Sequence, residues 1–327
     1  MIKKKFILVT GSYGFLAQNL IKKLLELNYN ILGIDKKKNI SFCYDFSSYR
    51  NKKKLINVSL DLNNEKKLYS HLSKYNIICC FHLAAITQVN ESDKYPLNNF
   101  KTNIMTTIYL LEYFRQHSKK TIFIYSSSDK AYGKFNKLPY KEDFPLNGIH
   151  PYDVSKSTSD KIVQTYNYHY NMKTAVTRSV NIYGPCDLNF NRLIPETILS
   201  IVKNKKIILR SNGKYLRDYI YVDDVVQGYI SLYKFMIKNK INLLNNTFNF
   251  GTNKPIKVIE LVKIIINKNK KYKKSIFIKD IANNEIINQY SNFSKSKKLL
   301  KWKPNFTLDT GIDLTIKWYT NYLLNKK

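Results

Sequence analysis

A short apolar run, a glycine-containing turn and an amphipathic helix follow one another directly at the start of the chain. Residues 6–9 (Phe-Ile-Leu-Val) predict a buried strand, and residues 10–17 (Thr-Gly-Ser-Tyr-Gly-Phe-Leu-Ala) lead into a helix whose apolar positions recur at helical spacing. Gly11 and Gly14 permit a tight turn, and the free N–H groups at a helix start bind phosphate. This order predicts an α/β fold whose first turn holds a pyrophosphate.

An acidic residue ends the next predicted strand, residues 31–34. Asp35 lies roughly 20 residues beyond the glycines, where a carboxylate accepts hydrogen bonds from an adenosine ribose 2′-OH and repels a 2′-phosphate. We therefore expect NAD rather than NADP as the cofactor. Asp61 repeats the strand-then-acid pattern, and we expect it near the adenine amino group.

Strands and helices alternate through the first half of the chain. Further strands are predicted at residues 77–83, 121–125 and 175–181, and helices at residues 103–115 and 152–170. This alternation predicts a Rossmann-type, doubly wound parallel sheet. It lapses beyond residue 185, so we expect two domains: an NAD-binding domain at residues 1–180, with a return segment near 218–250, and a smaller C-terminal α/β substrate-binding lobe, mainly residues 181–327.

Charge and cysteine usage narrow the class of protein. The formal net charge is +32, but the lysines are scattered among asparagine and isoleucine, and no nucleic-acid-binding motif accompanies them, so we expect no nucleic-acid partner. The 4 cysteines form no C-x-x-C pair and no metal-ligand spacing, so we expect no metal. No apolar run of about 18 residues occurs, which predicts no membrane span and a cytoplasmic protein.

Polar side chains follow the strand at residues 121–125, at the sheet edge where open α/β sheets bind ligands. They include Ser128, Asp129 and Lys130. Downstream, Tyr152 and Lys156 are four residues apart after a proline that favours a helix start, so they should share one helix face. A nearby ammonium lowers the pKa of a phenol from about 10, which predicts Tyr152 as a base near neutral pH.

Together these pieces resemble the extended short-chain dehydrogenase/reductase family, in its nucleotide-sugar epimerase and dehydratase branch. The matching pieces keep the family's order over nearly the whole length: Thr10-Gly11-x-x-Gly14-Phe15, Asp35, His82-Leu83-Ala84-Ala85, Ser126-Ser127-Ser128, Tyr152-x-x-x-Lys156, Arg178-x-x-Asn181-x-Tyr183-Gly184-Pro185, Arg217-Asp218 with Val222-Asp223-Asp224, Phe250-Gly251, and Ser294-Lys295-x-x-x-Leu299-Leu300-x-Trp302-x-Pro304.

The resemblance implies roles for particular residues. It implies NAD contacts from Gly11, Tyr13, Gly14, Phe15, Leu16, Asp35, Asp61, Leu62, Leu83, Ala84, Ala85, Tyr152 and Lys156. Contacts to a nucleotide-diphosphate sugar are implied for Asn181, Arg192 and Arg217, since a diphosphate suits the planar fork of arginine. Relatives often form homodimers, so we expect one here.

The residues after Ser128 discriminate within the family. Sugar 4,6-dehydratases place an acid and a base there, and Ser128-Asp129-Lys130 resembles the CDP-glucose 4,6-dehydratase type, whereas 4-epimerases usually have small or apolar residues. Lys130 alone is weak support, because 55 of 327 residues are Lys or Arg, but Asp129 is stronger in a chain with 23 acids. We expect a dehydratase. An epimerase or reductase on the same scaffold, and a nucleotide- or nucleic-acid-binding protein on a degenerate fold, remain alternatives.

Overall fold

The chain forms two compact units in the computed structural model, which describes residues 4–38, 40–238, 246–269, 271–281 and 285–324. Unit 1 consists of Met1–Lys134, Glu142–Ser179 and Tyr229–Phe248. Unit 2 consists of Phe135–Lys141, Val180–Gly228 and Asn249–Lys327. Each unit is thus assembled from three separate segments of the chain.

Unit 1 contains the alternating strands and helices. Its elements are β1 (Lys5–Thr10), α1 (Phe15–Glu26), β2 (Ile31–Asp35), α2 (Ser47–Asn51), β3 (Leu55–Ser59), α3 (Glu65–Leu72), β4 (Asn76–His82), α4 (Val89–Lys94), α5 (Pro96–Phe100), the π-helical turn η1 (Lys101–Met105), α6 (Thr106–His117), β5 (Ile122–Ser128), the 3-10 turn η2 (Asp129–Tyr132), α7 (Pro151–Tyr170) and β6 (Thr174–Ser179). Two further elements, α9 (Val222–Lys238) and β11 (Thr247–Phe250), are shared between the units.

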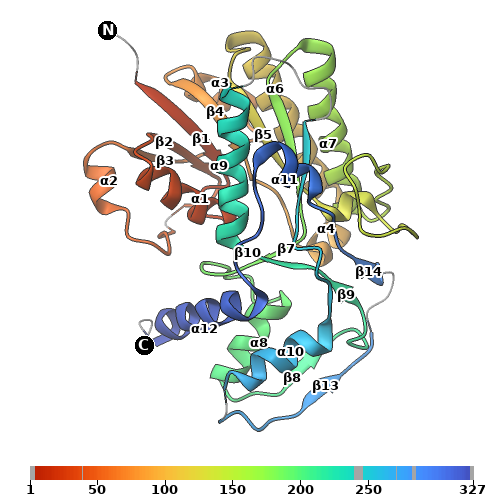
Figure 1. Cartoon of the computed structure of the whole chain (residues 1–327). Coiled ribbons are helices and arrows are strands. Elements are labelled where there is room, and N and C mark those ends of the chain that lie inside the picture. Colours follow the sequence, from red (N-terminus) through yellow and green to blue (C-terminus); the bar gives the residue numbers. More distant parts are fainter. Residues whose placement is uncertain (1–3, 39, 239–245, 270, 282–284, 325–327) are drawn as a thin grey trace. The chain divides into compact units, whose positions relative to one another are not determined.

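One seven-stranded sheet forms the centre of unit 1, in the order β11-β6-β5-β4-β1-β2-β3. The pairings from β3 through β6 are all parallel, and the order reverses between β1 and β4. Helices cover both faces of the sheet (Figure 1). The predicted Rossmann-type, doubly wound fold is therefore confirmed, and its switch point lies at the carboxyl ends of β1 and β4, where such sheets bind ligands.

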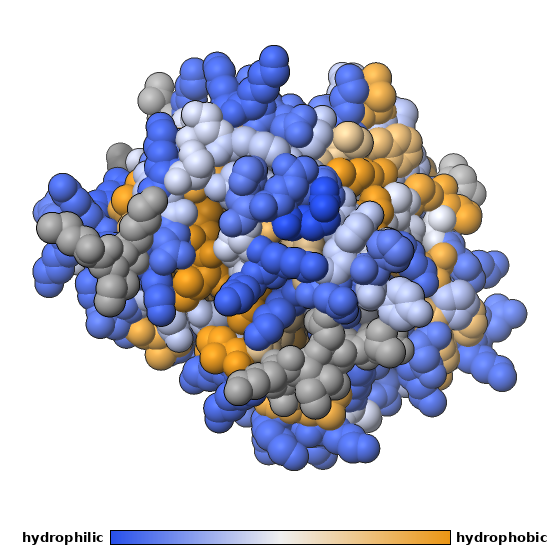
Figure 2. Space-filling model, turned by 90° about the horizontal axis from the view of Figure 1, so that it is seen from above, coloured by the Kyte–Doolittle hydropathy of each residue, from blue (hydrophilic) through white to orange (hydrophobic). Residues whose placement is uncertain are grey.

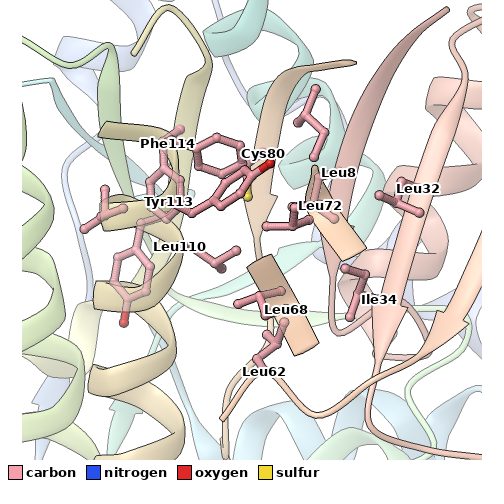
Figure 3. Close-up of a cluster of buried hydrophobic side chains, with 14 of the residues drawn as sticks. Leu8, Leu32, Ile34, Leu62, Leu68, Leu72, Cys80, Leu110, Tyr113 and Phe114 are labelled. Atoms are coloured by element: carbon pink, nitrogen blue, oxygen red, sulfur yellow. The ribbon is translucent and has the colours of Figure 1, made fainter. Parts of the chain in front are cut away.

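Alternate residues of each strand face opposite layers of helices. On one face, Leu8 and Cys80 belong to a buried cluster that α3 and α6 complete with leucine and aromatic side chains (Figure 3). On the other face, the ring of Phe81 lies 5.9 Å from that of Tyr229 and 6.0 Å from that of Tyr233, both on α9. The sheet is thus buried on both sides, which is why its strands are almost continuously apolar.

Unit 2 is built from shorter elements around a second buried cluster. They are β7 (Asn181–Tyr183), α8 (Leu193–Val202), β8 (Ile207–Leu209), β9 (Leu216–Arg217), β10 (Tyr219–Tyr221), β12 (Ile256–Lys257), α10 (Val258–Asn267), β13 (Ile276–Ile278), β14 (Asn288–Gln289), α11 (Ser294–Leu300) and α12 (Leu308–Leu324). The strands form three small sheets, β10-β7, β12-β9-β14 and β13-β8.

Two expectations about element boundaries need correction. The single strand predicted at residues 175–181 is interrupted, because Val180 N donates to Phe250 O and Asn181 N donates to Asp218 O, so the chain changes hydrogen-bond partners there. The helix predicted from residue 103 begins as the π-helical turn η1 before α6. The loop expected at Asn283 and Asn284 lies outside the described residues.

The surface seen in Figure 2 is largely hydrophilic, with smaller hydrophobic patches between the polar side chains. No helix in the described ranges is both long and apolar enough to cross a membrane.

Candidate active site

The glycine turn after β1 leaves no room for a side chain. Gly11 has φ +67°, and a Cβ there would lie 2.9 Å from the Cα of Ala84, in the loop after β4. Helix α1 then begins at Phe15, and its N-cap residue Gly14 makes no side-chain capping bond. The turn therefore packs closely against the end of β4 and leaves the helix N–H groups available for a ligand.

Asp35 is held by the backbone of two different segments. It is 9% exposed at the end of β2. Its Oδ2 accepts a hydrogen bond from Tyr13 N at 3.1 Å, and its Oδ1 accepts one from Lys37 N at 3.0 Å. The ring of Tyr13 lies 4.6 Å from that of Phe42. The carboxylate is thus fixed beside the glycine turn, with lone pairs remaining for a ribose hydroxyl.

The other predicted cofactor residues lie around the same strand ends. Asp61 is exposed and accepts a hydrogen bond from Asn63 N at 2.9 Å, whereas Leu62 is buried in the hydrophobic core. Phe15 and Leu16 are half-buried, as are Leu83 and Ala85.

His82 links the glycine turn to the helices behind it. Its Nδ1 lies 2.8 Å from Thr10 Oγ1 and its Nε2 lies 3.0 Å from Thr107 Oγ1. The Thr107 hydroxyl donates to Asn103 O, so we assign the proton of the neutral imidazole to Nε2 and the Thr10 hydroxyl as donor to Nδ1. Burial, with a smaller effect of Lys156, lowers the pKa of His82 to about 3, so the ring is neutral.

The π-helical turn η1 brings Asn103 into contact with two other segments, the loop at Ile86 and helix α7. Its Oδ1 accepts from Ile86 N at 2.8 Å, and its Nδ2 donates to Ser155 Oγ at 2.9 Å, while Ser159 Oγ donates to Asn103 O at 2.9 Å. Ser155 Oγ in turn donates to Tyr152 O at 2.8 Å. Together with His82, these bonds form a buried polar chain from the glycine turn to the backbone of the predicted base.

The predicted acid and lysine follow β5 in the 3-10 turn η2. Ser128 Oγ accepts a hydrogen bond from Lys130 N at 3.2 Å and donates one to Asp129 Oδ1 at 3.2 Å. Asp129 is 4% exposed, whereas Lys130 is only half-buried. The serine therefore fixes the start of the turn, and the carboxylate lies largely out of water.

Helix α7 packs against η2 and β5 and carries the predicted tyrosine and lysine pair. Tyr152 and Lys156 are both buried. Lys156 Nζ donates to Ser126 O at 2.7 Å and lies 5.0 Å from the centre of the Tyr125 ring. Burial lowers the pKa of Lys156 to about 7, and Asp160 opposes this shift. The structure thus brings the five predicted catalytic residues to one corner of unit 1.

One buried carboxyl group of this corner was not predicted. Asp153 lies beside Tyr152 in the first turn of α7 and is 2% exposed. Burial raises its pKa, while the charges of Lys130 and His150 lower it. Its position directly after the tyrosine was the available signal, but residue type alone does not distinguish a buried acid from one on a solvated helix face.

The three predicted substrate residues all belong to unit 2, and each is engaged there. Asn181 Nδ2 donates to Asp218 O at 3.1 Å. Arg192 pairs with the buried carboxylate of Asp187 at 3.0 Å. Arg217 is 8% exposed, donates to Leu216 O and Ile287 O, and pairs with the half-exposed Glu285 at 3.2 Å. Their side chains are therefore held in place before any ligand binds.

Comparison with known proteins identifies the family. The model of the GDP-mannose 4,6 dehydratase family matches residues 8–315. A putative UDP-glucose 4-epimerase of Methanocaldococcus jannaschii is 29% identical over 322 residues, covering 96% of this chain and 98% of its own. The dTDP-D-glucose 4,6-dehydratase of Homo sapiens is 29% identical over 332 residues, covering 99% and 92%.

Two solved structures have a similar fold over nearly the whole chain. The UDP-glucose 4-epimerase of Thermotoga maritima, determined with UDP-glucose, is 26% identical with a TM-score of 0.87 and covers 97% of this chain and 99% of its own. The dTDP-glucose 4,6-dehydratase of Bacillus anthracis, determined with NAD, has a TM-score of 0.82 at 24% identity and 97% coverage of both chains. The chain belongs to the GDP-mannose 4,6 dehydratase family, among the nucleotide-sugar epimerases and dehydratases.

Proposed function

We propose that this family member is an NAD-dependent nucleotide-sugar 4,6-dehydratase, which converts an NDP-glucose to the NDP-4-keto-6-deoxy sugar and water. The observation that supports this choice is the acid and amine pair Asp129-Lys130, held by Ser128 at the carboxyl end of β5 and packed against the helix of Tyr152. An epimerase needs only the oxidation chemistry, whereas a dehydratase also needs a second acid and base.

The first turn of unit 1 fits a dinucleotide. A side chain at Gly11 would strike the backbone of Ala84, so glycine lets this turn lie against the end of β4, next to the start of α1 whose N–H groups would hold a pyrophosphate. Asp35 would accept the ribose hydroxyls, which favours NAD over NADP. NAD held there would accept a hydride from C4 of the sugar and give it back at C6, and a proton returned to C5 would complete the product.

Tyr152 removes the proton of the sugar 4-OH in the oxidation step. Lys156 supports it, because an ammonium close to a phenol favours the phenolate. Ser126 O accepts a hydrogen bond from Lys156 Nζ, and Ser128 Oγ, which donates to Asp129 Oδ1 in this structure, would donate to the sugar oxygen when substrate is bound. The new C4 ketone then makes the C5 hydrogen acidic.

Asp129 and Lys130 perform the elimination. A base takes the C5 proton and an acid protonates the departing 6-OH, so that the C6–O bond breaks and water leaves. We assign the acid to Asp129, whose burial favours the protonated form, and the base, or its partner, to Lys130. CDP-glucose is among the candidate substrates.

We assign substrate contacts in unit 2 to Asn181, Arg192 and Arg217. Arg217 offers a planar fork for the diphosphate, and its ion pair with the half-exposed Glu285 is the contact that a diphosphate would replace. We also infer a homodimer formed through α6 and α7, by analogy with the family.

Product analysis separates the dehydratase from the 4-epimerase, the alternative that the relatives equally allow. Purified protein is incubated with NAD and, in turn, CDP-, dTDP-, UDP- and GDP-linked hexoses, and products are identified by NMR and mass spectrometry. A 4-keto-6-deoxy sugar that has lost water supports the proposal. A C4-inverted sugar of unchanged mass refutes it and establishes the epimerase.

A further inference from the structure

A buried guanidinium connects three elements of unit 1 that surround the proposed site. Arg178 is 2% exposed near the end of β6. Its Nε donates to Asp160 Oδ2 at 2.8 Å and its Nη2 donates to Asp160 Oδ1 at 3.0 Å. Asp160 lies in α7, one helical turn beyond Lys156 and two beyond Tyr152. The bidentate pair therefore fixes the catalytic helix against the sheet.

The same guanidinium also holds the turn η2. Its Nη1 donates to Tyr132 Oη at 2.9 Å and to Glu142 O at 3.2 Å, and its carbon lies 4.7 Å from the centre of the Tyr132 ring. Tyr132 is fully buried and is the last residue of the turn that carries Asp129 and Lys130. Arg178 thus contacts α7, η2 and the segment at residue 142 at once.

The turn also makes hydrogen bonds that do not involve Arg178. Lys130 N donates to Ser128 Oγ at 3.2 Å, Gly133 N donates to Lys130 O at 3.0 Å, and Asn147 N donates to Tyr132 O at 3.3 Å, and none of these three bonds involves α7. A lysine at position 178 would supply one point charge in place of the planar fork, and so would lose the simultaneous contacts.

We propose that Arg178 is a positioning residue, which together with Asp160 and Tyr132 sets the place of the Asp129-Lys130 turn relative to the Tyr152-Lys156 helix. The proposal rests on the proposed function for the roles of those four residues. Loss of the Tyr132 contact alone is selective: it shifts η2 and misplaces the elimination residues, while α7 keeps the Arg178–Asp160 pair and Lys156 keeps its anchor at Ser126 O. Loss of the guanidinium fork also weakens the pair that holds α7.

The first test compares the two half-reactions in the holoenzyme with the NDP-hexose that the wild type accepts. C4 oxidation is followed by NADH absorbance, and elimination by deuterium exchange at C5 and by product. We expect Tyr132→Phe to slow elimination about 10-fold with C4 oxidation within about 2-fold of wild type, since small misplacements cost large factors in rate. Arg178→Lys, which also weakens the pair that holds α7, should slow elimination about 100-fold and C4 oxidation less.

Matched controls come from a half-buried cluster with the same combination of an arginine, an acid and a tyrosine. Arg115 makes a bidentate pair with Glu112, to which the Tyr166 hydroxyl also donates. Arg115→Lys and Tyr166→Phe should leave both half-reactions within about 2-fold of wild type, because this cluster does not touch η2.

Hydrogen–deuterium exchange tests whether Arg178 positions the turn η2, independently of the reaction that the enzyme catalyses. We expect residues 129–133 to exchange at least about 5-fold faster in Tyr132→Phe and Arg178→Lys, with β1 unchanged. Equal slowing of both half-reactions with unaltered exchange at 129–133 would overturn the proposal. If the variants show the expected faster exchange at residues 129–133 but the wild type never eliminates water from a sugar, the proposed dehydratase reaction is refuted and the positioning role of Arg178 is not. Tyr132→Phe keeps the Arg178 pair, so it covers the case in which Arg178→Lys fails to fold.

Discussion

The two lysines of the proposed site are held very differently. Lys156 is 3% exposed, lies in the second turn of a 20-residue helix, donates to Ser126 O and is packed over the Tyr125 ring. Lys130 is half-buried in a turn of 4 residues. The oxidation residues thus belong to the rigid core of unit 1, whereas the elimination residues depend on the neighbours of a short turn.

This contrast indicates how one scaffold supports two reactions. Removal of a hydroxyl proton at C4 would be needed in an epimerase and in a dehydratase, and the residues proposed for it, Tyr152 and Lys156, are both buried on the long helix α7. The additional acid and base sit at a place where a short turn can change without disturbing the sheet. Three experiments would sharpen or break this distinction.

The largest effect is expected from Tyr152→Phe. Loss of the phenol removes the base common to both half-reactions, so turnover should fall by a factor of about 10² to 10⁴. Steady-state assays of product formation measure this, with Tyr166→Phe on the same helix as the matched control. Turnover within about 10-fold of wild type would remove Tyr152 from the mechanism. The distinction between residues proposed for oxidation and residues proposed for elimination would then be lost.

A more selective effect is expected from Lys130→Ala. Elimination should fall about 100-fold, while C4 oxidation persists, because the oxidation residues are anchored elsewhere. NADH absorbance and loss of the C5 hydrogen measure the two separately. Lys134→Ala, an exposed lysine just beyond the turn, serves as the control. If Lys130→Ala turns over normally, the acid and base must be sought at other residues, such as Asp153.

The smallest effect concerns stability and pH. Folding lowers the pKa of Lys156 from 10.5 to about 7, mainly through burial. Between these values the unfolded chain binds more protons than the folded protein, so this group makes stability rise with pH from about 7 to about 10. Relative to Lys156→Met, the wild-type free energy of unfolding should gain on the order of 1 kcal/mol per pH unit.

Urea unfolding of both proteins at several pH values in this window measures that difference. A difference that stays constant with pH would mean that Lys156 is not desolvated, and the contrast with Lys130 would then disappear.

Much of unit 1 could be predicted from the sequence because its signals are local. The apolar run before Gly11, the acid at Asp35 and the helix start before Tyr152 each follow from neighbouring residues, and the structure has the corresponding strands and helices. The polar residues at the end of β5 could be located because parallel strands end at one edge.

The features that could not be predicted from the sequence depend on contacts between residues distant in the chain. Helical periodicity cannot distinguish α6 from the π-helical turn before it, because contacts of Asn103 with Ile86 and Ser155 decide that turn. Arg178 was recognised as part of a motif, but its pairing with Asp160 and Tyr132 joins residues up to 46 positions apart. His82 was recognised as part of a motif, and the tertiary contacts identify the two threonines that it bridges.

The division of unit 1 into three segments limits how the gene can be dissected. A truncated chain ending at residue 180 would contain most of the sheet but omit β11 and the part of α9 that covers Phe81. Strand β6 would then be left with an open edge and one face of the sheet with bare aromatic rings, two features that promote self-association. Circular permutants that retain all three segments are better suited to isolating the catalytic half.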